Sequence, residues 1–416
     1  MDDGCAALVA AAVRHAAENF AFYRRRQPVE PSGPGDLELR GWPIVSRPEL
    51  AALADEALRG RSAPQFIGVT SGTGFRAGSS RPMVLRVACE AERETARQLA
   101  KGVSNGERRK PLAMRIVTSA HGLDFVGPVT GVFGLPLERV EHVDLAIDLL
   151  SRRFEFTGFS ERVELLVGPT NLIGGITSAL ADRGASAADF GICSVLCFGA
   201  YLSAELRSSI ENYWGVGPTD VYGLSEAPGV CGISCGQCGD FHFLPTAFTE
   251  LVALSQDRPC LPGEAGRLVV TTYFPLVEAM PLIRYDTGDV FRCNGSCCGG
   301  QTRYEFLGRM EDLIWVSDRT AFVSRAQLDD LTLETAPVAR SRDPRLRGLE
   351  LRRPTGRPIY EVTSQVDGLV VSYDFDLAMP PKIESSFIDG RIMAFSGTCS
   401  SEVPVRFAPR VQELNE

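Results

Sequence analysis

Apolar positions near the N-terminus recur with helical spacing. They run from about Cys5 to Arg24, with Asp2 or Asp3 available as an N-cap, and the polar stretch 24–28 follows them. The sequence therefore predicts an N-terminal helix.

Further along, the pattern from Gln65 to Thr70 is typical of a short strand. This strand enters a Gly/Ser-rich loop at 70–82, and helical spacing resumes near Cys89 to Lys101.

The middle of the chain alternates between short apolar runs and amphipathic stretches of helix length. We expect strands at 164–167, 192–198 and 219–222, and helices at about 170–183 and 203–214. This alternation predicts an α/β sandwich with mostly parallel strands. Ligands in such sheets usually sit beyond the carboxyl ends of strands, where Gly199-Ala200 and Tyr222 to Glu226 are expected.

After Glu250 the pattern becomes β-rich, with strands expected at 267–273 and 289–292. A boundary near Arg309 to Asp312 precedes about a hundred residues of mixed character, in which the arginine- and proline-rich stretch 338–358 is expected to be an exposed loop. A chain of 416 residues is too long for one ordinary core. We expect a large domain at 1–308 and a small one at 309–416.

Composition limits the class of protein. The hydrophobic content of 44% and the charged content of 23% are typical of folded proteins, and the net charge of -9 disfavours nucleic-acid binding. The start of the chain does not resemble a secretory signal, and no apolar run has the length of a membrane helix, so a cytoplasmic protein is expected. The twelve cysteines then favour metal ligation or buried thiols over disulfides.

The loop that begins at Thr70 could hold phosphate. Its hydroxyls and glycine turns can direct N–H groups at an anion, although its glycine spacing is not that of a Walker A loop. An ordinary surface loop explains these residues better when the loop is taken alone.

Three later segments also carry nucleotide-binding chemistry. Tyr222 could stack on a base while Ser225 and Glu226 face phosphates or Mg²⁺, and a buried tyrosine beside a solvated carboxylate is an equally good interpretation. Asp289 could accept hydrogen bonds from ribose hydroxyls, and Arg309 could bind ribose or phosphate oxygens. The order and spacing of these segments make the set specific.

Together these motifs resemble those of the adenylate-forming superfamily. The segments 198–200, 222–226, 279–285 and 307–309 are similar to the phenylacetate–coenzyme A ligase branch, and the resemblance covers nearly all of residues 10–330. It implies a large N-terminal α/β domain with mixed sheets sandwiched by helices and a small, mobile α+β C-terminal domain. It also implies ATP-dependent conversion of a carboxylic acid, with a small aromatic acid favoured, into an acyl-adenylate. The acyl group would then pass to coenzyme A, a carrier thiol or an amine.

The resemblance also implies roles for individual residues. Gly199 and Ala200 would flank adenine, Tyr222 would stack on it, and Asp289 with Arg309 would hold the ribose. The implied nucleotide site comprises Gly199, Ala200, Asp220, Tyr222, Gly223, Asp289 and Arg309. The implied catalytic set, which acts with ATP and Mg²⁺, comprises Thr70, Ser71, Thr73, Ser225, Glu226 and Arg309.

The cysteine-rich segments are similar to a zinc-binding subset of this branch. Cys235 and His242 match the first pair of ligands, while Cys298 with Cys293 or Cys297 would supply the second, and Cys238 is a possible substitute. Such a zinc site would be structural. Unmetallated thiols are the alternative.

The chain also departs from the family pattern. No lysine follows Lys382, the phosphate loop lacks its second threonine, and Ser317-Asp318-Arg319 replaces an expected Arg-Gly. These departures leave two alternatives to the ligase: an acyl-protein synthetase-like enzyme, for which Cys399 is a conceivable acyl acceptor, and a degenerate nucleotide-binding protein. The acid itself, coenzyme A as a ligand and a homodimer all stay open.

Overall fold

The computed structural model describes most of the first three quarters of the chain and separate strands after it. The described residues are 3–26, 38–58, 66–69, 83–86, 109–117, 131–137, 140–227, 230–297, 300–316, 321–324, 327–328, 360–365, 368–373, 388–396 and 399–409. The chain divides into two compact units, one of residues 1–107, 119–130 and 221–306, and one of residues 108–118, 131–220 and 307–416. The predicted domains 1–308 and 309–416 stay a prediction.

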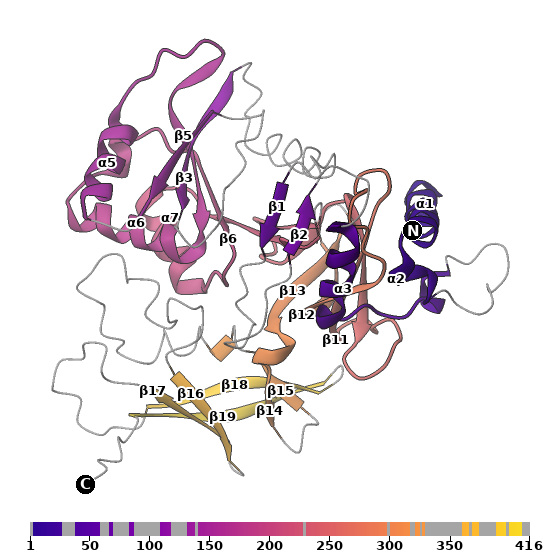
Figure 1. Ribbon diagram of the computed structural model, residues 1–416. Helices are drawn as coiled ribbons and strands as arrows, with labels where there is room; N and C mark the ends of the chain where they lie inside the picture. The colour runs from indigo at the N-terminus through magenta and orange to yellow at the C-terminus, as the bar shows by residue number, and fades with distance from the viewer. Residues whose placement is uncertain are drawn as a thin grey trace, which may run out of the picture. The chain divides into compact units, whose positions relative to one another are not determined.

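The first unit is built on antiparallel strands. They follow the order β10-β11-β12-β13-β9-β8-β7, and β1 and β2 form a separate two-stranded sheet (Figure 1). Its strands are β1 (Phe66–Val69), β2 (Met83–Arg86), β7 (Thr219–Gly223), β8 (Cys231–Ser234), β9 (Phe241–Phe243), β10 (Ala247–Ala253), β11 (Ala265–Thr272), β12 (Tyr285–Ser296) and β13 (Thr302–Arg309). Strands β7 and β13 each extend a few residues into the second unit.

Helices at the N-terminus supply part of the core of this unit. The helices are α1 (Asp3–Asn19), α2 (Ala21–Arg24), the short 3-10 helix η1 (Glu38–Gly41) and α3 (Arg47–Leu58). Ala12 and Ala16 of α1 are fully buried in the same apolar cluster as Leu268 and Val270 of β11. The predicted N-terminal helix is correct in place but not continuous, because Phe20 has extended backbone angles between α1 and α2.

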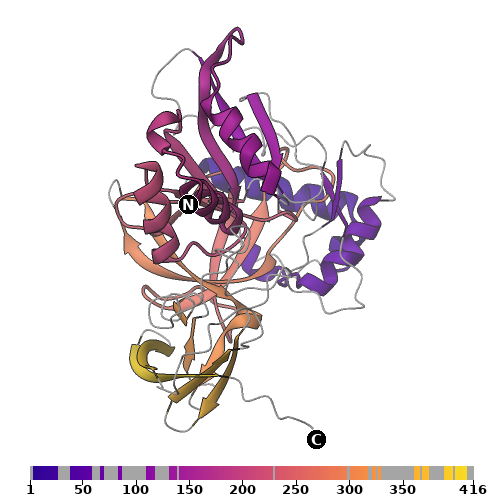
Figure 2. The ribbon, with the colours of Figure 1, turned by 90° about the vertical axis from the view of Figure 1, so that its left-hand side faces the viewer.

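The second unit contains the predicted parallel strands and helices. Strands β6-β5-β3-β4 lie in this order and pair in parallel, and α5, α6 and α7 lie beside them (Figures 1 and 2). The elements are β3 (Lys110–Val117), β4 (Gly131–Pro136), α5 (Val140–Ser151), β5 (Phe159–Pro169), α6 (Thr170–Asp182), η2 (Ala187–Asp189), β6 (Ser194–Phe198) and α7 (Ala204–Trp214). This arrangement confirms the predicted α/β class.

Local sequence explains the ends of α7. The hydroxyl of Ser203 accepts a hydrogen bond from Leu206 N at 3.2 Å, which caps the first turn. Gly215 follows the last turn with a φ of 72°, a left-handed conformation that glycine adopts without steric cost. The helix expected over about 203–214 from its amphipathic pattern therefore begins and ends at residues suited to those positions.

Six further strands form a second sheet of this unit, in the order β14-β15-β18-β19-β17-β16. They are β14 (Ile314–Val316), β15 (Ala321–Val323), β16 (Tyr360–Gln365), β17 (Gly368–Tyr373), β18 (Ile388–Ser396) and β19 (Cys399–Pro409), and the 3-10 helix η4 (Met310–Asp312) precedes them. Cys399 begins β19. The expected helix near 89–101 and the loop at 338–358 lie outside the described residues.

Among the described helices, none combines the length and the apolar character needed to cross a membrane.

Candidate functional site

An irregularity near the start of β12, where its pairing with β11 shifts register, positions the carboxylate of Asp289. Gly288 has a φ of 74°, and its N–H donates to Asp286 Oδ1 at 2.9 Å. Asp289 N donates to the hydroxyl of Thr287 at 3.1 Å, and that hydroxyl donates to Leu268 O of β11 at 2.9 Å. These bonds therefore fix the backbone of Asp289, a residue that is only 2% exposed.

Tyr222 of β7 reaches this carboxylate. Its hydroxyl donates to Asp289 Oδ2 at 2.6 Å, which is typical of a charge-assisted O–H···O bond. The ring is partly buried, and four phenylalanine rings lie around it with centroids 5.1 to 6.3 Å away. They belong to Phe241, Phe243, Phe291 and Phe306. Tyr222 thus has an aromatic support on its protein side and a carboxylate partner at its tip.

Glu226 lies just beyond the end of β7, buried with 6% exposure. Its Oε1 accepts a hydrogen bond from the hydroxyl of Tyr285 at 3.1 Å. Burial and the nearby Glu226 charge both raise the pKa of Tyr285, so its hydroxyl keeps its proton and stays a donor. Ser225 and Gly223, between Tyr222 and Glu226, are exposed.

The structure therefore brings Tyr222, Glu226 and Asp289 into one neighbourhood of the first unit. Sequence reasoning gave no role to Tyr285. The sequence did contain a pattern that includes it: in both segments a tyrosine precedes a carboxylate by four residues, Tyr222 before Glu226 and Tyr285 before Asp289.

Arg284 anchors the start of β12. Its guanidinium, 1% exposed, donates to Asp257 Oδ1 and Oδ2 at 2.6 and 3.0 Å, to Glu250 at 3.2 Å and to Trp42 O at 2.9 Å. The residue has a φ of 49°, and its N–H donates to Thr271 Oγ1 at 3.0 Å. A left-handed arginine that makes this many bonds fixes the direction in which the next residue, Tyr285, enters the core.

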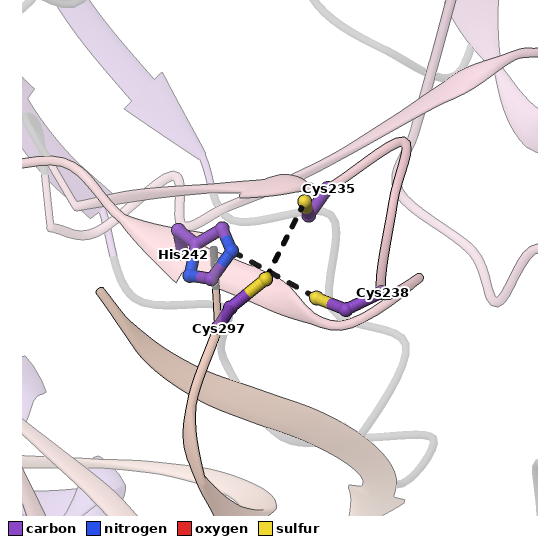
Figure 3. A group of neighbouring side chains, drawn as sticks. All are labelled: Cys235, Cys238, His242 and Cys297. Carbon is purple, nitrogen blue, oxygen red and sulfur yellow. Dashed lines mark hydrogen bonds between the residues drawn. The ribbon is translucent and has the colours of Figure 1, made fainter. Parts of the chain in front are cut away.

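Four side chains of the kinds that bind metals gather where the turn between β8 and β9, strand β9 and the segment after β12 meet. The ligand atoms of Cys235, Cys238, His242 and Cys297 all lie within 4.8 Å of one another, and Figure 3 shows them pointing toward a common centre. Cys235 Sγ lies 3.9 Å from Cys297 Sγ, and Cys238 Sγ lies 3.8 Å from His242 Nε2. Tetrahedral zinc with Zn–S bonds of about 2.3 Å would place sulfur atoms about 3.8 Å apart. The chemistry and spacing of this group therefore fit zinc.

Surrounding contacts orient the group. His242 Nδ1 lies 2.8 Å from Thr302 O, which assigns the proton to Nδ1 and leaves Nε2 to face the thiols. Backbone N–H groups of Cys238 and Gln237, followed by His242, lower the pKa of Cys235 to about 6. A thiolate is the form that binds a metal.

The group contains two of the residues expected from the sequence, Cys235 and His242, and two that the sequence offered as alternatives, Cys238 and Cys297. It does not include Cys293, which lies within β12 and whose carbonyl accepts from Gly263 N at 2.8 Å. Cys298 lies outside the described residues.

Other predicted residues belong to the second unit. Gly199 follows β6 with a φ of 77° and is exposed, and the hydroxyl of Thr170, at the start of α6, donates to Ala200 O at 3.0 Å. Asp220 is buried at 8% exposure. Arg309 is partly buried, with its guanidinium 3.9 Å from Glu311. The predicted phosphate residues Thr70, Ser71 and Thr73 lie outside the described residues.

Sequence comparison identifies related ligases over part of the chain. No protein-family model matches it. It is 30% identical over 187 residues to a phenylacetate–coenzyme A ligase of Thermus thermophilus, a match that covers 40% of each protein. It is 31% identical over 138 residues to the phenylacetate–coenzyme A ligase of Escherichia coli, which covers 31% of this chain and 30% of the relative. The chain thus spans less than half the length of the curated relatives it matches.

Two solved structures with a similar fold are coenzyme A ligases. A 2-hydroxyisobutyryl-CoA ligase in the postadenylation state superposes with a TM-score of 0.62 at 15% identity, covering 90% of this chain and 78% of that one. An anthranilate CoA ligase in complex with anthranoyl-AMP gives 0.51 at 14% identity, covering 77% and 58%. This likeness confirms the predicted fold, that of adenylate-forming ligases.

Proposed function

We propose that the chain, which is similar over 40% of its length to a phenylacetate–coenzyme A ligase and has the fold of adenylate-forming ligases, activates a carboxylic acid with ATP. The product of the first step would be an acyl-adenylate, with pyrophosphate released. The acyl group would then pass to an acceptor, and coenzyme A is favoured because the similar proteins are coenzyme A ligases. A carrier thiol or an amine is the alternative acceptor.

One observation carries the proposal: two segments far apart in the sequence meet through a tyrosine and a carboxylate. Tyr222 donates to Asp289 at 2.6 Å. In the proposed site the ring of Tyr222 would stack on adenine, and the Asp289 carboxylate beside it would bind the ribose hydroxyls.

A carboxylate oxygen of the acid attacks the α-phosphorus of ATP, the new P–O bond forms, and the bond to the bridging oxygen of the β-phosphate breaks. No proton is needed for this step. The protein would mainly hold the two anions in line, which accounts for the use of fixed side chains such as Asp289 and Glu226.

Glu226 is the residue proposed to hold Mg²⁺. Magnesium prefers hard oxygen ligands and usually binds through one or two carboxylates plus phosphate oxygens. Glu226 fits this preference, because its Oε1 has a fixed hydroxyl partner and the second oxygen adds further lone pairs. The cation, when bound, would neutralise phosphate charge. Ser225, exposed next to Glu226, is proposed to contact a phosphate oxygen.

Pyrophosphate release tests this function. The full chain would be mixed with ATP, Mg²⁺ and each member of a panel of small aliphatic and aromatic acids, and phenylacetate would be included. At least one acid is expected to raise pyrophosphate release above the level without acid, and Asp289→Asn should abolish most of that rise. ATP binding without release for any acid would instead support a nucleotide-binding protein without turnover.

If pyrophosphate is released and the acyl-adenylate stays bound to the protein, candidate acceptors can be added to it one at a time. Coenzyme A should convert the bound acyl group to a thioester. Acylation of the chain itself, removed by Cys399→Ser, would instead support the acyl-protein synthetase-like alternative. A homodimer stays a prediction.

We also propose that Cys235, Cys238, His242 and Cys297 hold a structural zinc ion. Four sulfur and nitrogen ligands would complete a tetrahedral shell, and no position would be open for a substrate. The ion would join the turn between β8 and β9 to the segment that follows β12. It would therefore stabilise the ends of the strands and take no part in the reaction.

A further inference from the structure

Tyr285 and Glu226 form the second half of a reciprocal arrangement. Tyr222, in β7, donates to Asp289 in β12, and Tyr285, at the start of β12, donates to Glu226 just after β7. In each segment the tyrosine precedes the carboxylate by four residues. Each segment therefore supplies one hydroxyl to the other and receives one in return.

The backbone of Tyr285 is held from two sides. It pairs with Val270 of β11 in the antiparallel sheet. On the other side Val45 N donates to Arg284 O at 2.8 Å, and Asp286 N donates to Val45 O at 2.9 Å. The hydroxyl of Tyr285 thus extends from a main chain that is bonded along both edges, and its side chain is fully buried. A donor on such a rigid element can fix its partner accurately.

Glu226 lies outside the regular strands of the sheet. It follows β7 in a bend rather than in a strand, so its carboxylate depends on side-chain contacts for its direction. Other charges act at the same place, because Arg47 and Asp289 both lie close enough to influence the pKa of Tyr285. A carboxylate among such charges needs a directional bond to keep one orientation.

We propose that Tyr285 is a positioning residue that orients Glu226 toward the Mg²⁺ of bound Mg·ATP. The proposal rests on the proposed function, since it takes Glu226 as the magnesium ligand. The hydroxyl holds Oε1, and the remaining lone pairs of the carboxylate face the cation. Partners that hold a ligating carboxylate commonly change metal affinity by tenfold or more when they are removed.

Tyr222 makes the corresponding hydrogen bond to Asp289, the carboxylate proposed to bind the ribose of ATP. Removal of the Tyr222 hydroxyl therefore provides a matched control. Tyr285→Phe and Tyr222→Phe each remove one hydroxyl from one carboxylate. Tyr285→Phe should reduce the extent to which Mg²⁺ strengthens ATP binding. Tyr222→Phe should weaken ATP binding whether or not Mg²⁺ is present.

The experiment measures ATP binding by calorimetry to the full-length chain, in Mg²⁺-free buffer and with saturating Mg²⁺. We expect the wild type to bind ATP more tightly with Mg²⁺. In Tyr285→Phe the ratio of the ATP affinity with Mg²⁺ to that without Mg²⁺ should fall about tenfold, while the Mg²⁺-free affinity stays unchanged. Tyr222→Phe should weaken both affinities by a similar factor. A Tyr285→Phe protein that keeps the full Mg²⁺ gain would overturn the inference and leave the proposed function standing.

Two further results bear on the inference. A wild type that binds no ATP under either condition would overturn both proposals, and one that binds ATP equally with and without Mg²⁺ would overturn this one alone. Should Tyr285→Phe not fold, Glu226→Gln replaces it, because glutamine can still accept the Tyr285 bond while the ligand charge is lost. Its Mg²⁺ gain should fall, and an unchanged gain would contradict the proposal.

A double variant tests the connection directly. If Tyr285 acts through Glu226, then Tyr285→Phe should lower the Mg²⁺ gain no further in a Glu226→Gln background. Independent effects that simply multiply would show that Tyr285 acts in another way.

Discussion

The hydroxyl of Tyr222 donates to Asp289 Oδ2 at 2.6 Å, across 67 positions of the sequence. Asp289 is 2% exposed, so the bond satisfies a buried charge. A single contact thus connects the stability of the first unit with the site where a nucleotide is proposed to bind. The two consequences can be separated by changing one partner at a time.

Loss of the Tyr222 hydroxyl should destabilise the fold. In Tyr222→Phe the Asp289 carboxylate loses a charge-assisted donor, and we expect a loss of about 1.5–3 kcal/mol in the free energy of unfolding. Urea denaturation would measure it. Tyr213→Phe is the matched control, because that hydroxyl donates to the neutral carbonyl of Ala185 at 2.9 Å and should contribute only about 1 kcal/mol. If the two variants lost equal free energy of unfolding, the charge of the Asp289 carboxylate would not strengthen its bond with Tyr222.

Loss of the Asp289 charge should affect nucleotide binding more than folding. Asparagine in Asp289→Asn can still accept the Tyr222 bond, so the protein should fold, while ribose hydroxyls lose a charged acceptor. We expect the Kd for ATP to rise by tenfold or more, as measured by calorimetry. Asp148→Asn removes an exposed carboxylate of α5 and should leave the Kd unchanged. A Kd that is the same in Asp289→Asn as in the wild type would remove the basis of the proposed ribose site.

The buried arginine should be among the most sensitive positions. Arg284→Met would remove the cation that pairs with Glu250 and Asp257. Because the Asp257 side chain is 48% exposed and water can replace part of the interaction, we expect a loss of about 1.5–3 kcal/mol. Arg152→Met breaks only an exposed pair with Asp148 and should cost less than about 0.5 kcal/mol. Thermal unfolding compares the two. A melting temperature for Arg284→Met equal to that of Arg152→Met would show that Arg284 does not anchor β12.

The zinc proposal predicts one zinc ion per chain by elemental analysis of the purified protein. Cys235→Ser should lose most of that metal and unfold at a lower temperature, because the remaining three ligands bind less tightly. Cys193→Ser, which changes an exposed thiol of the second unit, should keep both the metal and the melting temperature. A wild type that contains no zinc and does not gain thermal stability when zinc is added would rule the site out.

Acid should remove the contribution that Glu49, in the first turn of α3, makes to the stability of the fold. Its Oε2 accepts bonds from Ser46 N at 2.8 Å and Ser46 Oγ at 2.6 Å, and Arg26 pairs with the other oxygen. Partial burial opposes ionisation, but the Ser46 and Arg26 bonds outweigh it and lower the pKa to about 2. Because the folded pKa lies below the unfolded one, of about 4.3, the stabilisation is present above pH 4.3 and is lost as the pH falls toward 2.

Glu49→Gln should therefore be less stable than the wild type at pH 7, by about 1 kcal/mol after allowance for the partial exposure of this side chain. The difference should shrink between about pH 4.3 and pH 2. Urea denaturation at pH 7 and at pH 2.5 would measure both. A difference that grows in acid would mean that the sign of the pKa shift is wrong.

Much of the fold could be predicted from local patterns. The helices α6 and α7 and the strands β6 and β7 occur within a few residues of the predicted ranges, because helical spacing, the Ser203 cap and the apolar runs act over short distances. Strand β5, from Phe159 to Pro169, is much longer than the four residues predicted. Its first residues are mixed in polarity, so their pairing with β3 leaves no clear sequence pattern.

The candidate site divides in the same way. The residue types, the motif order and the resemblance to a known family together pointed to Tyr222, Glu226, Asp289, Cys235 and His242, because each motif is local. Which side chains touch depends on how β7, β8, β9 and β12 are arranged in the sheet. That arrangement pairs Tyr285 with Glu226 and brings Cys238 and Cys297, rather than Cys293, to His242. Local residue chemistry limits which groups can react or bind, whereas contacts between distant segments require strand pairing and core packing, which depend on the whole chain at once.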